Sequence, residues 1–175
     1  MQLPTPLFLL LATAAGCVTP DPRTLSVPAT REHVQRDVET LLTALYAGDA
    51  DTLLRFTHPL ILERLGGLER AKPALAEIAR QLQTKKLRVE SLSFPSPPDL
   101  LDAKGRRFAI VPTLTVITAE GKRRESLNYQ IGVLDAGASS WKYVAGSSYD
   151  ATNVRSLFPD FPADYQFPKF YRKQL

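Results

Sequence analysis

Soft metal ligands and a strong charge of either sign are both lacking in this sequence. Its 175 residues contain one cysteine and two histidines. One cysteine cannot form an intramolecular disulfide, and so few soft ligands nearly exclude a zinc site. Lys and Arg number 22 against 18 Asp and Glu, and the net charge of +4 is smaller than a nucleic-acid-binding domain usually carries. We therefore predict no metal site and no nucleic-acid partner.

Motifs for catalysis or phosphate binding are lacking as well. Gly66-Gly67 is not followed by the Lys and Ser or Thr of a P-loop, and the chain has no G-x-S-x-G sequence. The composition, with 44% hydrophobic and 23% charged residues, is nevertheless that of a globular protein with a sizeable core. The sequence thus predicts a folded domain with no cofactor, and it gives no support for catalysis.

The first residues have the pattern of a signal peptide. Residues 1–16 carry no charged side chain, and residues 7–15 form an apolar stretch that ends in small residues. A helix that spans a bilayer needs about 20 apolar residues, so this stretch is too short to span and matches the hydrophobic region of a signal peptide. We expect residues 1–16 to be a signal peptide.

The only cysteine follows this stretch directly. Ala14-Ala15-Gly16-Cys17 resembles the lipobox of bacterial lipoproteins, in which the cysteine is acylated and becomes the mature N-terminus. The resemblance implies a lipid attachment at Cys17 and a place in the cell envelope, on the periplasmic or extracellular side of a bacterial membrane. The alternative is an ordinary secretory signal peptide that is cleaved nearby, in which Cys17 has no role in lipid attachment. Residues 17–28, with three prolines and no apolar period, are predicted to be a tether.

Helical periodicity marks the first half of the folded part. Apolar residues recur at helical spacing over 29–46, with Thr30 as N-cap and Gly48 as the stop. A second short helix follows Asp49 and ends at His58-Pro59, and a helical stub covers 60–65. We place the start of the next main helix near Lys72, so that Pro73 falls in its first turn. Counting the stub apart, the sequence predicts three N-terminal helices.

After Lys86 the apolar period changes to two. Four strands are predicted at 87–94, 107–118, 124–135 and 140–147, with 95–105 as a loop. Short turns make them an antiparallel meander. A change of parity near Glu90-Ser91 predicts a bulge and a curved sheet, and the second strand, apolar on both parities, is predicted to be central. The fold class is α+β, with the three helices packed on a curved four-stranded antiparallel sheet.

This order of elements resembles the NTF2-like (SnoaL-type, cystatin-like) fold. Two short motifs accompany this order: residues 46–51 close the first helix, and Trp141-Lys142-Tyr143 lies in the last strand. The resemblance covers roughly residues 29–149, and we assign 29–150 to an NTF2-like domain. The resemblance implies a conical pocket between the helices and the concave sheet, and dimerisation through the sheet face. It implies no particular reaction.

Two hypotheses for function follow. The first is a lipid-anchored envelope protein whose NTF2-like domain binds a small apolar ligand or an envelope protein partner without catalysis. The second is a SnoaL-like enzyme of the isomerase, cyclase or hydrolase type, with His58 or Asp150 as the base. Tyr46, Asn128 and Tyr129 are candidate pocket residues. The alternative roles are local: a turn contact for His58 and a strand end for Asp150.

Two further features of the sequence lie outside these hypotheses. In an antiparallel meander, Lys85, Lys86 and Arg88 come near residues 122–124 (Lys-Arg-Arg), which could form a surface for anionic lipid or could simply be solvated. Residues 151–175 form a strap rich in proline and aromatic residues. Because exposed aromatic surface is unfavourable, we predict that its phenylalanines dock on the domain, namely Phe158, Phe161 and Phe167. The alternative is that the strap is a docking segment for a partner or a lid over the pocket.

Overall fold

The helical half of the chain has the caps that the sequence predicts. The computed structural model describes residues 30–85 and 87–175. Its first helices are α1 (Arg31–Ala47), α2 (Ala50–Phe56) and α3 (Pro59–Arg64). Thr30 Oγ1 accepts a hydrogen bond from His33 N at the start of α1, and Gly48, with φ of 79°, ends it. Asp49 caps α2 in the same way, through Thr52 N.

The fourth helix, α4 (Leu68–Thr84), begins earlier than expected. Pro73 lies inside it, not in a first turn near Lys72, so that prediction was wrong. Gly67 precedes the helix with φ of 84° and its carbonyl accepts from Arg70 N and Ala71 N. The stub at 60–65 is a helix in its own right, and the N-terminal half therefore has four helices in place of three.

The sheet is an antiparallel meander of the four predicted strands, extended by two others. The predicted strands are β1 (Arg88–Ser93), β3 (Arg106–Ala119), β4 (Lys122–Asp135) and β5 (Lys142–Ala145), in the order β1-β3-β4-β5. The register between β1 and β3 shifts between Val89 and Ser91, which confirms the bulge. Phe108, Ala109, Ile110 and Val111 are all fully buried, which confirms that β3 is central and covered on both faces.

The two additional strands correct the predicted number of four to six. β2 (Asp99–Ala103) lies in the segment predicted as a loop and pairs with the start of β3. β6 (Tyr171–Gln174) lies at the end of the strap and pairs with β4 from Arg124 to Leu127. The chain also forms a short 3-10 helix, η1 (Gly146–Ser148), and one helical turn, α5 (Val154–Leu157).

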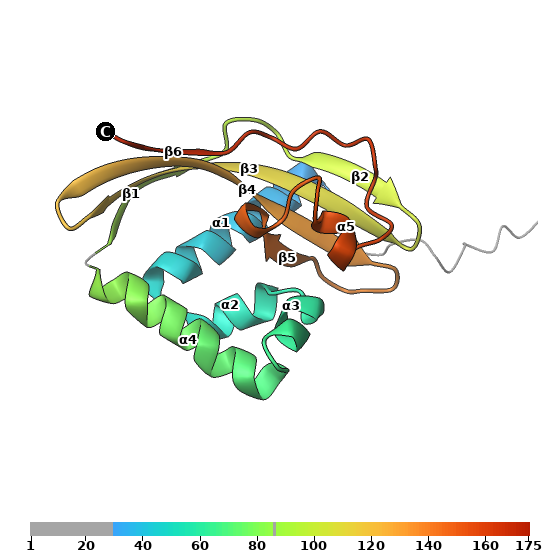
Figure 1. Cartoon of the computed structure of the whole chain (residues 1–175), viewed down its shortest axis with the longest axis horizontal. Coiled ribbons are helices and arrows are strands. Elements are labelled where there is room, and N and C mark those ends of the chain that lie inside the picture. Colours follow the sequence, from blue (N-terminus) through green and yellow to red (C-terminus); the bar gives the residue numbers. More distant parts are fainter. Residues whose placement is uncertain (1–29, 86) are drawn as a thin grey trace, which may run out of the picture.

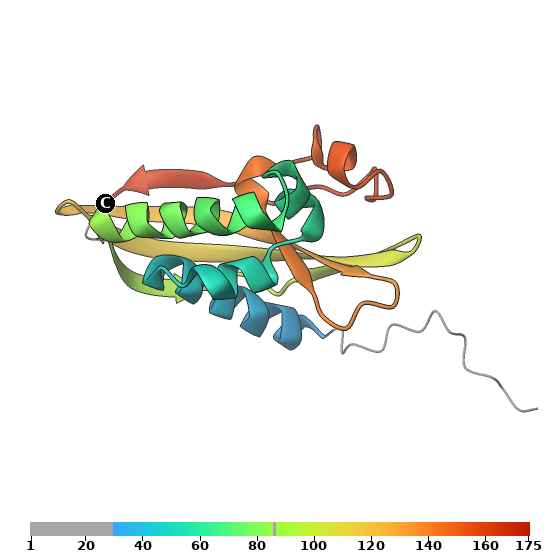
Figure 2. The same ribbon diagram turned by 90° about the horizontal axis from the view of Figure 1, so that it is seen from below.

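Two apolar cores lie on opposite faces of the sheet. Figures 1 and 2 show α1, α2 and α4 on one side of the sheet. On one face, α1 packs through Val34, Val38 and Leu42 against Trp141, Tyr143 and alternate residues of β3 and β4. On the other face, the strap packs on Phe108, Ile110, Ile131 and Val133. The fold is thus α+β, with α1, α2 and α4 on one face of a six-stranded antiparallel sheet and the strap on the other, where Leu60 and Ile61 of α3 also reach the core.

The strap docks by its aromatic side chains, as predicted. Phe158 and Phe161 are buried and contact the ring of Phe108 at centroid distances of 5.4 and 4.9 Å. Phe167 is partly buried and stacks on Phe161 at 5.2 Å. Within the described residues, no helix has the length and apolarity needed to cross a membrane.

Candidate ligand pocket and its polar surroundings

A pocket of about 290 Å³ lies between the helices and the sheet. Its apolar wall comes from the helices, and its other wall from β4, β5 and the residues that follow β5. The apolar side chains are Leu41, Leu42, Leu45, Leu53, Ile61, Leu75, Ile78, Val144 and Ala145. A concave site with this lining is typical of sites for small apolar molecules.

Few polar side chains face this pocket. The Thr57 hydroxyl donates to Leu53 O at 2.7 Å, and the Tyr149 hydroxyl accepts from Arg64 Nη1 at 3.1 Å. Gln130 of β4 is only 8% exposed, and its amide makes no hydrogen bond with another group in the described part of the chain. The Gln130 amide is therefore the group best placed to orient a ligand that carries one polar atom.

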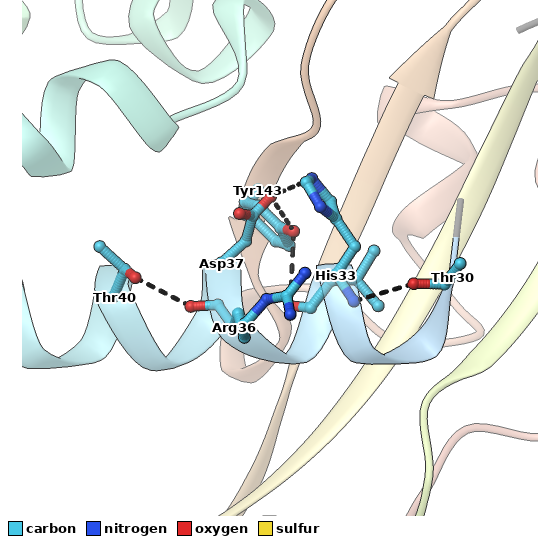
Figure 3. Close-up of polar contacts among 7 residues, drawn as sticks. Thr30, His33, Arg36, Asp37, Thr40 and Tyr143 are labelled. Atoms are coloured by element: carbon cyan, nitrogen blue, oxygen red, sulfur yellow. Dashed lines mark hydrogen bonds and ion pairs between the residues drawn. The ribbon is translucent and has the colours of Figure 1, made fainter. Parts of the chain in front are cut away.

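Tyr143 also lines the pocket, but α1 engages its hydroxyl. Figure 3 shows Tyr143 of β5 pointing to Asp37 of α1, with His33 one turn earlier on the same helix. The hydroxyl donates to Asp37 Oδ2 at 3.0 Å, and His33 Nε2 lies 3.6 Å from the same oxygen. Burial raises the pKa of Tyr143 far above its usual value, with Asp37 adding to the effect. Tyr143 is thus a neutral donor that fastens α1 to β5.

His58 is buried, with 2% of its surface exposed, outside the pocket lining. Its Nδ1 accepts a hydrogen bond from Leu60 N at 3.2 Å, which puts the proton of the neutral ring on Nε2. Nε2 is buried and lies 3.6 Å from Asp135 Oδ2, while the ring contacts Phe158 edge-on at 5.1 Å. Both nitrogens face groups of the protein itself, so His58 has no free lone pair for a substrate.

His58, Asp135, Arg106 and Asp160 form a cluster of ionisable side chains, which we call the charge cluster. Arg106 Nε lies 3.4 Å from Asp135 Oδ1 and 3.1 Å from Asp160 Oδ2, and its guanidinium stacks over the Phe158 ring at 5.4 Å. The cluster joins the start of β3, the end of β4 and the strap. Its geometry favours a structural role, in which charges hold the strap against the sheet.

The position of His58 predicts a pH dependence of stability. Burial lowers the pKa of His58 below its usual 6.5, and Arg106 adds to the lowering while Asp135 opposes it. The unfolded chain then binds a proton more readily than the folded chain, so stability is highest above about pH 6.5 and falls as the pH drops below it. Urea denaturation at pH values between 5 and 7.5 measures this fall, whose slope for one proton is at most about 1.4 kcal/mol per pH unit.

His58→Asn is the matched control. Asparagine is also a good N-cap acceptor for Leu60 N, but it does not titrate. We expect the variant to be less stable at every pH, with a flatter dependence in this interval. If the variant keeps the full dependence of the parent protein, His58 is not its source.

The other predicted site residues do not meet in one place. Asp150 is exposed and accepts a hydrogen bond from Thr152 N at 2.8 Å. The hydrogen bonds that Thr152 donates lower the pKa of Asp150. Tyr46 packs beside the α1 core, and buried Tyr129 lies on the strap face, where its hydroxyl donates to Tyr149 O at 2.8 Å. Asn128 lines a different pocket. None of the four lines the pocket between the helices and the sheet, as Gln130 does.

Comparison of the chain with known protein families, curated proteins and solved structures finds no match. In the described residues, no three His, Cys, Asp or Glu side chains are grouped so that they could hold a metal ion. The case for a function therefore depends on the pocket and on the surface of this molecule.

Proposed function

We propose that this chain is a lipid-anchored cell-envelope protein whose NTF2-like domain binds a small apolar molecule without catalysis. The observation that carries the proposal is the apolar pocket of about 290 Å³ between the helices and the sheet. The volume suits a molecule of roughly the size of a short acyl chain or a two-ring compound. Gln130 supplies the hydrogen bond that fixes the orientation of such a ligand.

The NTF2-like assignment is supported by the order of the elements and by the position of the pocket. Helices precede an antiparallel sheet that is curved at the β1 bulge, and the pocket opens between the two layers. Because the strap occupies one sheet face over Phe108 and Ile131, dimerisation through that part of the face would require the strap to move. A ligand inside the domain is therefore favoured over a partner on the sheet face.

The lining of the pocket argues for binding and against the SnoaL-like enzyme. It includes no carboxylate, histidine, lysine or cysteine among the described residues. Its ionisable side chains are Tyr143 and Tyr149, and burial with Asp37 keeps Tyr143 protonated. General acid-base catalysis most often uses a histidine or a carboxylate that reaches the substrate, and the described lining of this pocket presents neither.

The anchor is proposed from the sequence. Cys17, the signal peptide at 1–16 and the tether at 17–28 lie outside the described residues. An acylated Cys17 would hold the domain at the periplasmic or extracellular side of a bacterial membrane, since each buried methylene contributes about 0.8 kcal/mol.

Binding of the fluorescent apolar probe N-phenyl-1-naphthylamine tests the pocket. Ile78 lines the pocket mouth and is 46% exposed, so Ile78→Trp adds bulk there without strain in the core. We expect this variant to bind the probe at least about ten-fold more weakly, a loss of about 1.4 kcal/mol. Thermal melts of each variant verify that the fold is retained.

Leu68→Trp is the control for this experiment. Leu68 lies on the same helix and is 56% exposed, but it does not line the pocket. The control should bind the probe as the parent protein does. Equal weakening by both substitutions, or no binding of the probe by the parent protein, would contradict the proposed site.

A further inference from the structure

The end of the sheet near the C-terminus presents an unusual arrangement of charge. Figures 1 and 2 both place the C-terminus, the β3–β4 turn and the end of α4 at the same end of the molecule. Basic residues from all of these segments gather there: Lys85, Arg88, Lys122, Arg123, Arg124, Arg172 and Lys173. The strand pairing sorts these residues between the two faces of the sheet.

On the strap face, Arg123 and Lys173 are paired with glutamates, whereas Arg88, which the register places opposite Thr118 on this face, forms no ion pair with a described residue. Glu90 pairs with Arg123, and Glu125 accepts from Lys173 Nζ at 2.8 Å and from the Tyr171 hydroxyl at 2.7 Å. The register places Lys173 opposite Glu125, so these side chains project from the same face. The two glutamates thus compensate charge on this face only.

On the opposite face, the basic residues remain uncompensated. Arg124 pairs with Gln174, and Ser126 with Arg172, which places both arginines on the face that carries Gln130. Arg124, Arg172 and Lys122 are exposed and form no ion pair with a described residue. Glu125, next to Arg124 in the sequence, projects from the strap face with Lys173, and Glu120 lies in the turn two residues before Lys122. This face therefore has a positive potential.

A second pocket, of about 310 Å³, opens beside these arginines between β4, β6 and η1. Its lining is rich in donors: Arg172, Ser126, Ser147 and Asn128. The Oδ1 of Asn128 accepts from Tyr129 N at 2.8 Å, which leaves its amide N–H groups free to donate outward. No carboxylate is among the described residues of this lining. These are groups that bind a phosphate ester.

One large apolar side chain borders this pocket, and two others lie along the same edge of the sheet. Phe170 lines the pocket and is 61% exposed, and Tyr171 and Leu175 beside it are 39% and 49% exposed. Basic residues together with exposed aromatic and aliphatic side chains are characteristic of surfaces that enter the interface of an anionic bilayer. A soluble anion would use the arginines but would gain nothing from the exposed apolar groups.

We propose that this end of the sheet docks on an anionic lipid bilayer. Arg172 and the hydroxyls of the pocket bind a headgroup phosphate, Arg124 and Lys122 add attraction at longer range, and Phe170 and Leu175 enter the interface. This contact is independent of Cys17 and of the apolar pocket under the helices, so either proposal can fail without the other.

Sedimentation with lipid vesicles tests this contact. The full chain carrying Cys17→Ser, which prevents acylation, is mixed with phosphatidylcholine vesicles with and without phosphatidylglycerol. We expect binding that is stronger to the anionic vesicles and that weakens as salt is added. Each basic residue near an anionic surface contributes about a five-fold factor in affinity, so Arg124→Gln with Arg172→Gln should lower binding to anionic vesicles about 30-fold.

The control variant combines Lys104→Gln and Arg70→Gln. Both residues are exposed and lie away from this end of the sheet, and the net charge changes equally. Phe170→Ser should also weaken binding, while the control should not. Equal binding to neutral and anionic vesicles, or an equal effect of the control, would overturn the proposal.

Discussion

Replacing Phe158 with alanine should lower the free energy of unfolding by about 3–5 kcal/mol, the usual cost of removing a fully buried phenylalanine. Phe158 has no exposed surface, and its ring meets Phe108 at 5.4 Å and His58 at 5.1 Å. It also lies beneath the Arg106 guanidinium at 5.4 Å. The substitution leaves a cavity between the strap and the sheet and removes the apolar contact of the charge cluster.

Chemical denaturation of Phe158→Ala and of Phe170→Ala provides the test. Phe170 belongs to the same strap but is 61% exposed, so its truncation should change stability by less than about 0.5 kcal/mol. We also expect Phe158→Ala to bind a hydrophobic dye more strongly, because loosening of the strap exposes the sheet face. Near-equal stabilities of the two variants would mean that the strap does not contribute to the core.

Cys17→Ser should release the protein from the membrane fraction of a bacterial host into the soluble envelope fraction. Acylation of Cys17 is the proposed attachment, and serine offers no thiol for it. Without acyl chains the anchor is lost entirely, whereas a bilayer contact at the other end of the chain remains weak and salt-dependent. Fractionation at high salt separates these two contributions.

Val18→Ser is the matched control, because it introduces the same side chain one residue later and keeps the thiol. This control should stay in the membrane fraction. Mass spectrometry of the mature N-terminus completes the experiment. A parent protein that is soluble, or whose mature N-terminus is a residue other than an acylated Cys17, contradicts the lipoprotein proposal.

Local patterns in the sequence predict most of the fold because they depend on near neighbours. Thr30, Gly48 and Asp49 act as caps through groups three or four residues away, and the bulge beside Glu90 is visible as a change of apolar parity. The central position of β3 follows from apolar residues on both parities, such as Ile110 and Val111. These features need no knowledge of distant segments.

The sequence does not predict pairing between strands that are far apart in the chain. β6 pairs with a strand more than 40 residues earlier, and its four exposed residues carry no apolar alternation. Leu100-Leu101 and the Lys104-Gly105 turn are the signals that could have marked β2, although three prolines precede them.

The candidate site is less predictable still, because it depends on which sheet face the helices cover. The alternation of β4 separates Gln130 from Tyr129, but only the packing of α1 and of the strap decides which residue faces the pocket. His58 and Asp135 are far apart in the sequence and meet through the strand order. A short polar pattern could not have revealed this pair.

The position of the strap also constrains when the molecule can fold. Phe158 and Phe161 complete the core over β3 and β4, yet they are synthesised after every strand of the meander. Contacts between residues this far apart in the sequence form slowly, since the chain must first close long loops. Until synthesis reaches the strap, Phe108 and Ile110 keep an apolar face uncovered, which would suit recognition by chaperones and passage across a membrane before folding.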